Sequence, residues 1–497
     1  MCNNEPTSTG CGCDAGYNRR EFMTLAGLAT GAAMASMPFM TRVAEGSSVR
    51  GEKRPARVRV AFLYPASSAF ADAPDGWWSW PGNEFDAEGR QRAYMESLEN
   101  KARPLGVQLQ MDSGSIQNEA QAQSLITALG DERPDGLVLI MFYNRSLSLA
   151  DTLLEAAKDM GIPVVFYIGL GVKHGSIAAY RREGVYFIQA YEDLEAIANG
   201  LRMIAAKVRL EQSLILSVTE ADARGEGVEE FFGIRVRVIP FDEYARLFKE
   251  AQISASDRSW METIVAEAQE VRGISAESAE NALRAHLALR ELIAAENADG
   301  VTMNCLQTGM LKPCISFSEL NSELIPAACE NDLAAAYTQM LGQLLTGKPG
   351  FQHNPAFDTE RNQYYASHCT CPIRLQGPEG PKTPYLLRRF AHTNEGSCAI
   401  QVFWEEGEPL TMVRYHYGEA PKLDVYAGRV AASYPMPPVG GCTTNVAVEL
   451  TDRKDACMVQ GHHNLLFHGD YARRFRLFAN LYGLPLADTG FDGHWAI

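Results

Sequence analysis

Apolar runs of strand length alternate with segments of helical periodicity in this chain, and no other feature constrains its fold as strongly. The first half carries four strand-like runs, at residues 58–64, 106–111, 135–142 and 162–168. Three helical patterns separate these runs, at residues 85–104, 118–129 and 147–160. Strands that alternate with helices pack as parallel βαβ units with right-handed crossovers. The sequence therefore predicts a Rossmann-like parallel-sheet domain over residues 55–182.

A second α/β pattern follows and then gives way to a different texture. Strand-like runs recur at residues 213–218, 234–239, 299–304 and 325–329. Helical patterns cover residues 192–208 and 257–297, the latter with an expected break at Gly273. After residue 350, short alternating segments separated by Gly and Pro indicate antiparallel β structure. We expect an α/β fold: a central Rossmann-like domain over residues 183–350 follows the first, and a mainly antiparallel β-rich domain over residues 351–497 comes last.

The first 45 residues have the pattern of a targeting segment. Arg19 and Arg20 are adjacent, and a weakly apolar run follows at residues 24–40. This order is typical of twin-arginine signals, which direct folded proteins across a membrane. A chance pair of arginines before a buried helix is the alternative. The prediction is an exported protein, periplasmic or extracellular, with the twin-arginine translocation machinery as a partner.

Composition excludes several classes of protein. The 497 residues are 46% hydrophobic and 21% charged, as in an ordinary globular chain, and the formal charge is −16. An acidic balance of this size argues against a nucleic-acid partner. Beyond the signal we find no apolar run near the 18 residues of a membrane span, so no further span is expected.

The cysteine pattern favours thiols over a recognisable metal motif. Eight of the 11 cysteines lie between Cys305 and Cys457. The Cys-x-Cys pair at Cys369 and Cys371 has no zinc spacing and no second pair to accompany it. We expect these cysteines to be buried and mostly free.

Several catalytic signatures are missing from the sequence. No Gly-x-Gly-x-x-Gly follows the first strand, and no P-loop, Gly-x-Ser-x-Gly or His-Glu-x-x-His occurs. Dinucleotide redox chemistry, phosphoryl transfer and serine hydrolysis therefore lack their local signals.

Glu330 and Asp332 form the first candidate site. They lie on the turn between a strand-like run at residues 325–329 and a helix whose apolar positions start at Leu333. In open α/β sheets, ligands bind at the carboxyl ends of the strands. The alternative is that Asn331 or Asp332 simply caps the helix.

Histidines near the C-terminus form further candidates, since eight of the ten follow residue 350. Neighbouring residues on a strand point to opposite faces, so at most one of His462 and His463 can enter a given pocket. A neutral imidazole binds Mn, Fe, Co or Zn, but it can equally be a hydrogen-bonded structural group. His368, at an expected strand end, has the same two interpretations.

A tryptophan-rich loop is the last candidate. Trp77, Trp78 and Trp80 lie together in a stretch with Gly and Pro. Flat rings can stack on the apolar face of a sugar, or they can form a packing or subunit contact.

Five short segments of the sequence together resemble the L-fucose/L-arabinose isomerase family. The resemblance lies in Ile-Pro-Ala-Ala-Cys-Glu-Asn-Asp-Leu-Ala-Ala-Ala at residues 325–336 and in a Leu-Leu-Thr-Gly-Lys-Pro helix end at residues 344–349. It extends to the His-Cys strand at residues 364–372, to Gly-His-His at residues 461–463 and to Gly-Leu-Pro at residues 483–485. With the order of α/β, α/β and β domains, the similarity spans residues 57 to about 488.

This resemblance implies a divalent metal, commonly Mn²⁺, that bridges two oxygens of an open-chain sugar while a carboxylate moves a proton between C1 and C2. Matched by position, Asp332 would be a metal ligand and proton carrier, His463 a metal ligand, and Glu330 a weaker catalytic candidate. We also expect Trp78, Trp80, His368 and Asn304 to contact the sugar. The family resemblance further suggests a homo-oligomer in which a neighbour's tryptophan loop completes the pocket.

One position departs from the family pattern. Where family members carry a glutamate after the strand near residue 304, this chain has Thr308. Glu319 or Glu323 could replace it only if the loop folds back. Three functions therefore stay open: a metal-dependent sugar isomerase, another sugar-active enzyme such as one that cleaves glycosides between two carboxylates, and a non-catalytic exported sugar-binding protein.

Overall fold

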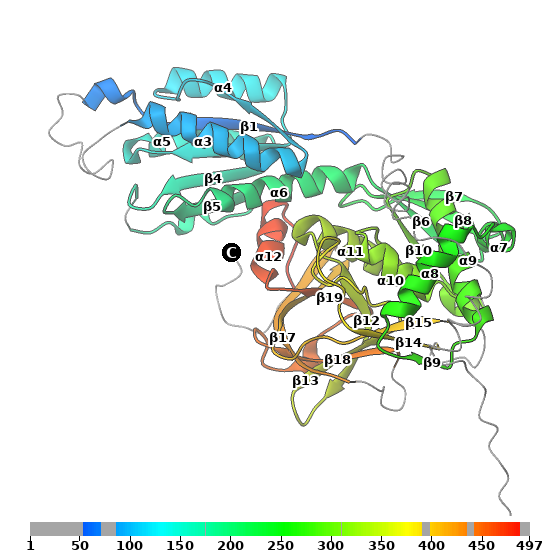
Figure 1. Ribbon diagram of the computed structural model, residues 1–497. Coiled ribbons are helices and arrows are strands. Elements are labelled where there is room, and N and C mark those ends of the chain that lie inside the picture. The colour runs from blue at the N-terminus through cyan, green and yellow to red at the C-terminus, as the bar shows by residue number, and fades with distance from the viewer. Residues whose placement is uncertain are drawn as a thin grey trace, which may run out of the picture.

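The computed structural model describes residues 53–70, 86–173, 175–309, 311–389, 398–434 and 442–487. The predicted signal, with Arg19 and Arg20, and the predicted sugar contacts Trp78 and Trp80 lie outside these ranges. The described residues form a mixed α/β structure with two largely parallel sheets and a closed antiparallel barrel (Figure 1).

The first sheet is parallel throughout, with strand order β2-β1-β3-β4-β5. Its strands are β1 (Ala56–Leu63), β2 (Val107–Met111), β3 (Gly136–Met141), β4 (Val164–Gly169) and β5 (Val185–Ala190). All six residues of β3 are buried, because helices cover both faces of the sheet. One face packs against α3 (Ala87–Ala102) and α6 (Leu194–Glu211), the other against α4 (Glu119–Asp131) and α5 (Leu147–Asp159).

The first sheet extends further along the chain than the sequence indicates. We expected the second unit to begin at residue 183, but β5 pairs with β4 in parallel. Helix α6 also packs on the first sheet, where Leu201 and Ile204 join its apolar core. The choice of a strand's partner depends on tertiary packing, which local patterns do not report.

The second sheet has strand order β11-β10-β6-β8-β7 and is parallel except for β7. Its strands are β6 (Leu214–Thr219), β7 (Gly225–Val228), β8 (Arg235–Pro240), β10 (Gly300–Met303) and β11 (Ala327–Cys329). The helices of this region are α7 (Phe241–Glu250), α8 (Ala255–Glu267), α9 (Ala276–Ala295), α10 (Cys314–Ser322) and α11 (Leu333–Thr346). The break expected at Gly273 is confirmed: this glycine has φ +63° and lies between α8 and α9.

The C-terminal region forms a closed antiparallel barrel, which confirms the predicted change to antiparallel β structure. Strand order around it is β12-β13-β18-β17-β16-β19. The barrel strands are β12 (Gly350–Asp358), β13 (Gln363–His368), β16 (Pro409–His416), β17 (Lys422–Ser433), β18 (Thr444–Leu450) and β19 (Asn464–His468). A small sheet beside it joins β9 (Val271–Arg272), β14 (Tyr385–Arg388) and β15 (Ala399–Val402).

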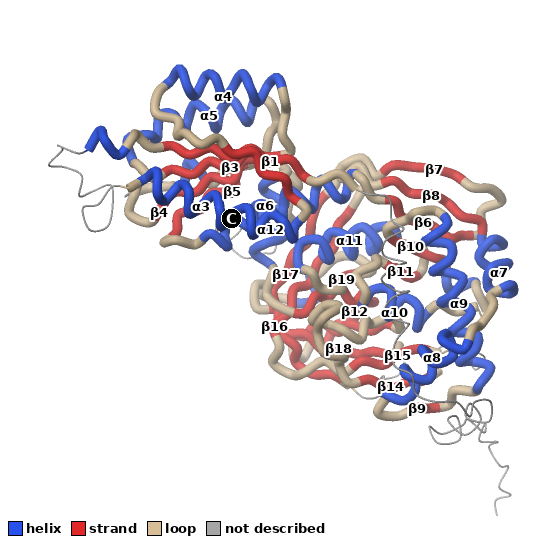
Figure 2. Tube along the Cα trace, turned by 45° about the horizontal axis from the view of Figure 1, so that its top comes forward, coloured by secondary structure: helices blue, strands red, loops and turns tan. Residues whose placement is uncertain are grey.

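The molecule has two lobes. The first sheet and its helices make the first lobe, and the second sheet with the barrel makes the second lobe (Figure 2). Helix α12 (Ala472–Leu481) contacts both β5 and β17, so it ties the barrel to the first lobe. Short 3-10 turns complete the described elements, at Ser67–Phe70, Arg103–Leu105, Asn144–Ser146, Ala178–Tyr180, Cys305–Gln307 and Ala456–Met458.

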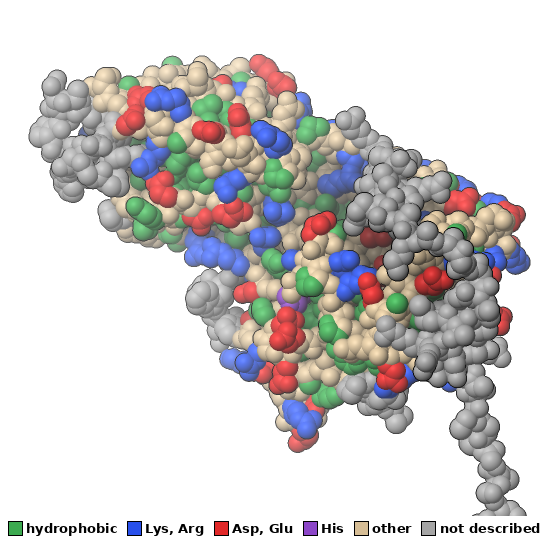
Figure 3. Space-filling model, viewed as in Figure 1, with side chains coloured by type: hydrophobic (Ala, Val, Ile, Leu, Met, Phe, Trp, Pro, Cys, Tyr) green, Lys and Arg blue, Asp and Glu red, His purple; other side chains and the backbone are tan. Residues whose placement is uncertain are grey.

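The surface shows no segregation of charge by sign on the face in Figure 3, where acidic and basic side chains are interspersed. Within the described ranges, no helix combines the length and the apolar character needed to cross a membrane.

Candidate metal centre

The turn from β11 into α11 positions two carboxylates at the end of a buried strand. Strand β11 is 1% exposed or less at each residue. Glu330 and Asn331 then adopt left-handed backbone with φ of 62° and 52°, which is unusual for residues other than glycine. The Asn331 amide donates to the carbonyl of Met303 at 2.9 Å, and its side-chain oxygen accepts from Ser217 at 2.7 Å. These bonds hold the turn in its strained conformation.

Asp332 caps α11, which was the alternative to a ligand-binding role for this residue in the sequence analysis. Its Oδ1 accepts a hydrogen bond from the amide of Ala335 at 2.9 Å. The local role does not exclude a wider one, because Oδ2 faces away from the cap toward the barrel, where it meets His463.

Glu330 lies at the carboxyl ends of the strands of the second sheet, and the topological switch point of this sheet is between β6 and β10. From β6 the chain continues to β8 on one side, and it returns to β10 and β11 on the other. Ligands of open α/β sheets bind where the strand order reverses in this way. Asn304 follows β10 and Glu220 follows β6, and the Asn304 amide donates to both Glu220 oxygens at 2.9 and 3.0 Å. The predicted Asn304 thus lies at these carboxyl ends, beside a carboxylate that the sequence analysis missed.

The barrel contributes two imidazoles to the same place. His368 is the last residue of β13, His463 immediately precedes β19, and each side chain is only 3% exposed. Nε2 of His368 lies 3.5 Å from Oε1 of Glu330, and Nε2 of His463 lies 3.3 Å from Oε2. Glu330, His368 and His463 offer one ligand atom each within 4.8 Å of one another, so they could hold a metal ion. Of the adjacent pair, His462 is exposed.

Asp332 orients one of these imidazoles. Its Oδ2 accepts from Nδ1 of His463 at 3.0 Å and from the His463 backbone amide at 3.2 Å. Arg414 contacts the same oxygen at 3.4 Å and also donates to the His463 carbonyl. Because an ionised carboxylate only accepts, Nδ1 carries a proton, and in the neutral ring Nε2 is then left with a lone pair. The structure therefore brings Asp332 and His463 together as expected, with Asp332 behind the imidazole rather than within the three-residue group.

The environment of His463 fits a bound cation. Its Nε2 is buried, and among the described residues it has no hydrogen-bond partner of acceptable geometry. A lone pair that faces the carboxylate of Glu330 at 3.3 Å is repulsive unless a proton or a cation lies between the two atoms. Histidine and carboxylate donors suit a divalent metal.

The charges of the centre shift one another's titration. Contacts with the His368 and His463 rings hold the pKa of Glu330 well below its usual range. Burial alone would raise the pKa of Asp332, but the hydrogen bond from His463 and the charge of Arg414 lower it to about 2. Burial would likewise lower the pKa of His463, yet its contacts with Asp332 and Glu330 raise it. Both carboxylates are thus ionised at neutral pH, as cation binding requires.

Thr308 occupies the position where the resemblance would place a glutamate, and its side chain is buried. Thr308 is 5% exposed, and its hydroxyl donates to the carbonyl of Cys305 at 2.8 Å. Neither possible substitute joins the group of Glu330 and the two imidazoles, because Glu319 lies within α10 and Glu323 pairs with Arg290.

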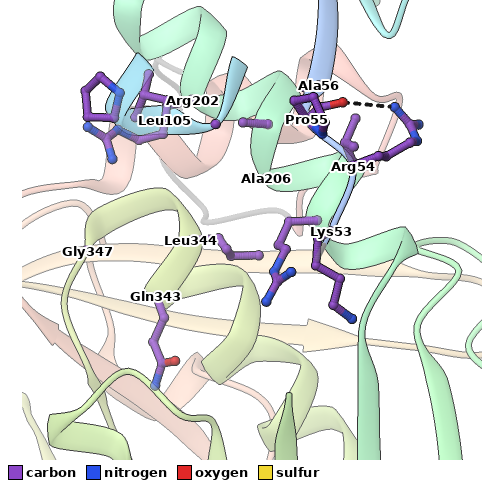
Figure 4. Close-up of a pocket in the computed structure, with 15 residues that line it drawn as sticks. Lys53, Arg54, Pro55, Ala56, Leu105, Arg202, Ala206, Gln343, Leu344 and Gly347 are labelled. Atoms are coloured by element: carbon purple, nitrogen blue, oxygen red, sulfur yellow. Dashed lines mark hydrogen bonds between the residues drawn. The ribbon is translucent and has the colours of Figure 1, made fainter. Parts of the chain in front are cut away.

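A separate cavity of about 460 Å³ lies between the first lobe and α11 (Figure 4). Lys53, Arg209 and Leu344 are among the residues that line it. Lys53 and Arg209 both pair with Asp299 at 2.9 Å, so these charges belong to a structural ion pair. Glu330 does not line this cavity, which is therefore distinct from the metal centre.

Comparison with known proteins adds no assignment: no protein-family model matches the chain, and no curated protein is similar enough in sequence to count as a relative.

Proposed function

We propose that this protein is a metal-dependent enzyme of the aldose–ketose isomerase type that acts on a small open-chain sugar. The observation that carries the proposal is the buried Nε2 of His463, which lacks a hydrogen-bond partner among the described residues and faces Glu330. With His368, these residues offer two imidazoles and one carboxylate, a donor set that suits a divalent transition metal, and the family resemblance points to Mn²⁺ among these. The finer layout, with two Rossmann-like domains and an isomerase-type barrel, is part of the same proposal.

A bound divalent cation would polarise the sugar carbonyl and stabilise negative charge on its oxygens. The protein's part is to hold Glu330, His368 and His463 in place and to keep the His463 ring in one tautomer through Asp332. Asp332 is less suited to carry the proton, because its carboxylate already caps α11 and orients the His463 ring.

Glu220 is the better candidate for the proton carrier. It follows β6, two strands away from β11, and neighbouring strands are about 4.8 Å apart, so roughly 9–10 Å separate the two strand ends. That span accommodates a sugar between Glu330 and Glu220. The exposed Glu220 carboxylate would take the proton from C2 of the aldose and return it to C1, with Asn304 holding its oxygens.

The same spacing supports a second candidate function. Two carboxylates about 6.5–9.5 Å apart are typical of inverting glycoside hydrolases. The strand ends that precede Glu220 and Glu330 are about 9–10 Å apart, a backbone spacing that allows such a pair. Such an enzyme would keep its activity after chelation, whereas an isomerase of the proposed type would lose it.

Export and assembly complete the proposal. The twin-arginine pattern at Arg19 and Arg20 supports export in folded form to the periplasm or beyond. The family resemblance supports a homo-oligomer in which the loop with Trp78 and Trp80 completes a neighbour's pocket.

The test combines metal analysis with sugar conversion by the full-length protein. We expect stoichiometric Mn²⁺ and interconversion of an aldose and its ketose, followed by NMR over a panel of pentoses, hexoses and deoxyhexoses. Chelation and His463→Ala should abolish both. His416→Ala is the matched control, because His416 pairs with Asp424 on the same barrel and lies outside the centre.

Three outcomes contradict the proposal in different ways. Glycoside cleavage that survives chelation would establish the second candidate. Sugar binding without turnover would make the protein a non-catalytic binding protein. Metal content that is unchanged in His463→Ala would show that Glu330, His368 and His463 do not hold the ion.

A further inference from the structure

Five buried cysteines gather directly behind the metal centre. They come from five separate segments, after β10, at the start of α10, at the end of β11, after β13 and before β18: Cys305, Cys314, Cys329, Cys369 and Cys442. Each is 7% exposed or less, all belong to one apolar cluster, and all are free thiols, as the sequence analysis expected. We call these five residues the thiol cluster. The spacing of these cysteines along the chain matches no metal motif, so the thiol cluster is recognised only in the folded structure.

The thiol cluster contacts the imidazole of His368, which also belongs to the group of Glu330 and His463. Cys329, Cys369 and His368 offer ligand atoms within 4.8 Å of one another. Nδ1 of His368 lies 3.6 Å from Sγ of Cys369, while Nε2 of the same ring faces Glu330. The ring therefore separates a group of oxygen and nitrogen donors from a group of sulfur donors.

The distances within the thiol cluster match those around a tetrahedral metal ion. With metal–sulfur bonds of about 2.3 Å and metal–nitrogen bonds of about 2.0–2.1 Å, tetrahedral ligands lie about 3.8 Å apart for two sulfurs and about 3.6 Å apart for sulfur and nitrogen. The observed separations are 3.9 Å between the sulfurs of Cys314 and Cys369 and 3.6 Å between Cys369 and His368. A disulfide would require about 2.05 Å. The two sulfurs are thus too far apart for a disulfide, and the 3.6 Å between Cys369 and His368 fits two ligands of one ion.

We propose that Cys329, Cys369 and Nδ1 of His368 form a second metal site, which takes a thiolate-binding cation of the Zn²⁺ class. On binding, the Cys329 and Cys369 thiols release one proton each to solvent. Two thiolates, one neutral imidazole and a divalent cation then sum to zero charge, which suits a buried apolar place. When Nε2 of His368 also binds an ion at the neighbouring centre, the ring releases its last proton to solvent and carries one negative charge. Sulfur donors disfavour Mn²⁺ and Mg²⁺, so the two sites select different metals by their ligands.

The test uses Co²⁺ as a probe, because its bonds to thiolate produce strong charge-transfer absorption in the near ultraviolet. The full-length protein, reduced and stripped of metal, is titrated with Co²⁺ and then with Zn²⁺. We expect one equivalent of Co²⁺ to produce the band and one equivalent of Zn²⁺ to remove it. Cys329→Ser and Cys369→Ser should each weaken binding by about 100-fold or more, as expected when a thiolate ligand is lost.

Two control variants establish whether the band belongs to this site. Cys371→Ser should leave the band intact, because Cys371 is equally buried but its sulfur contacts the carbonyl of Pro372 instead. Glu330→Gln should also leave it intact while it removes the metal of the neighbouring centre. Failure of the proposed isomerase activity would therefore not remove the band, and absence of the band would not affect that activity.

A measurement on the unmodified protein keeps the proposal testable if the serine variants do not fold. X-ray absorption of the Zn²⁺-loaded chain should show two sulfur neighbours at about 2.3 Å. A shell of only nitrogen and oxygen would overturn the proposal. So would the absence of a thiolate band in the wild-type protein, or a band that persists in folded Cys329→Ser and Cys369→Ser; either result would make the thiol cluster a packing feature.

Discussion

The two sheets share the order of the four parallel strands around the switch point, β2-β1-β3-β4 in the first and β8-β6-β10-β11 in the second, but they differ in the side chains at the carboxyl ends of these strands. We call these ends the first edge and the second edge. Strand order reverses between β1 and β3 in the first sheet and between β6 and β10 in the second. At the first edge, Tyr64 and Phe142 stack with ring centroids 5.7 Å apart, and Tyr94 packs against Phe142 at 5.2 Å. At the second edge, Glu220, Asn304 and Glu330 follow the corresponding strands.

This difference shows that a switch point supplies a place but not the chemistry. The described part of the first edge is closed by its own aromatic side chains, and the nearby carboxylate of Glu88 accepts hydrogen bonds from Ser67. The second edge faces the barrel, which provides His368 and His463. Glu330, at a strand end, therefore belongs to a group that could hold a metal ion only because the barrel supplies the two histidines.

The largest effect on stability should come from truncating Phe142, which packs in the aromatic cluster at the carboxyl ends of β1 and β3. Phe142 is 3% exposed, and Phe142→Ala removes its contacts with Tyr64 and Tyr94. We expect a loss of about 3–5 kcal/mol in the free energy of unfolding, as for other buried phenylalanines, with unchanged affinity for Mn²⁺. Urea denaturation and Mn²⁺ titration measure the two quantities. A fall in Mn²⁺ affinity in the folded variant would show that the two edges act together.

The second-largest effect should be on Mn²⁺ affinity, which we expect to depend on a carboxylate of the second sheet and not on one of the first. Glu330→Gln removes the one carboxylate of the three-residue group, so we expect Mn²⁺ affinity to fall by more than the roughly 10–100-fold typical of an outer-shell partner. Glu88→Gln, at the first edge, should leave the affinity unchanged. Calorimetric titration gives both values. Equal losses in the two variants would remove the distinction drawn between the sheets.

Asp332→Asn should have a smaller effect on the same quantity. Asparagine still caps a helix well, so α11 should keep its stability, but the His463 ring loses its charged acceptor. We expect Mn²⁺ affinity to fall by about 10–100-fold. If the affinity falls as far as in Glu330→Gln, Asp332 is a direct ligand, as the family resemblance implies.

The smallest effect concerns pH and the second lobe. Burial raises the pKa of Glu319 to about 7, above the 4.5 of a free side chain. Between these values the folded protein keeps a proton that the unfolded chain has lost, so the free energy of unfolding falls as pH rises through this window. From pH 6 to 8, the wild type should lose about 1 kcal/mol relative to Glu319→Gln.

The control for this pH effect comes from the first lobe. Glu99 is exposed on α3, so Glu99→Gln should follow the wild-type pH profile. Urea denaturation at several pH values provides the comparison. Parallel profiles for wild type and Glu319→Gln would show that Glu319 does not titrate in this window.

Local patterns predicted the secondary structure well because each signal is contained in a short segment. The alternation in the first half anticipates β1 to β4 and their helices, and the strand-to-helix turn places Glu330 and Asp332 correctly. The boundary expected at residue 183 comes before β5, yet this strand pairs with β4 of the first sheet, because pairing partners are chosen by packing and not by the strand's own residues.

The candidate site was predictable in part. The contact between Asp332 and His463 spans 131 residues of chain, and only the family resemblance linked them. Sequence could not tell which carboxylate would face the metal, since Glu330 and Asp332 flank the same turn and helix capping binds one of them. Glu220 was missed although it follows a predicted strand, as Glu330 does, because nothing local shows that the two strands lie at one switch point.

The position of β19 has a consequence for biosynthesis. This strand is the last of the barrel, it lies between β12 and β16, and His463 immediately precedes it. A nascent chain on the ribosome would therefore expose Glu330 and His368 long before the final donor emerges. If the proposed ion is bound, its capture would be the closing event of maturation, because a polypeptide that ends before β19 lacks His463.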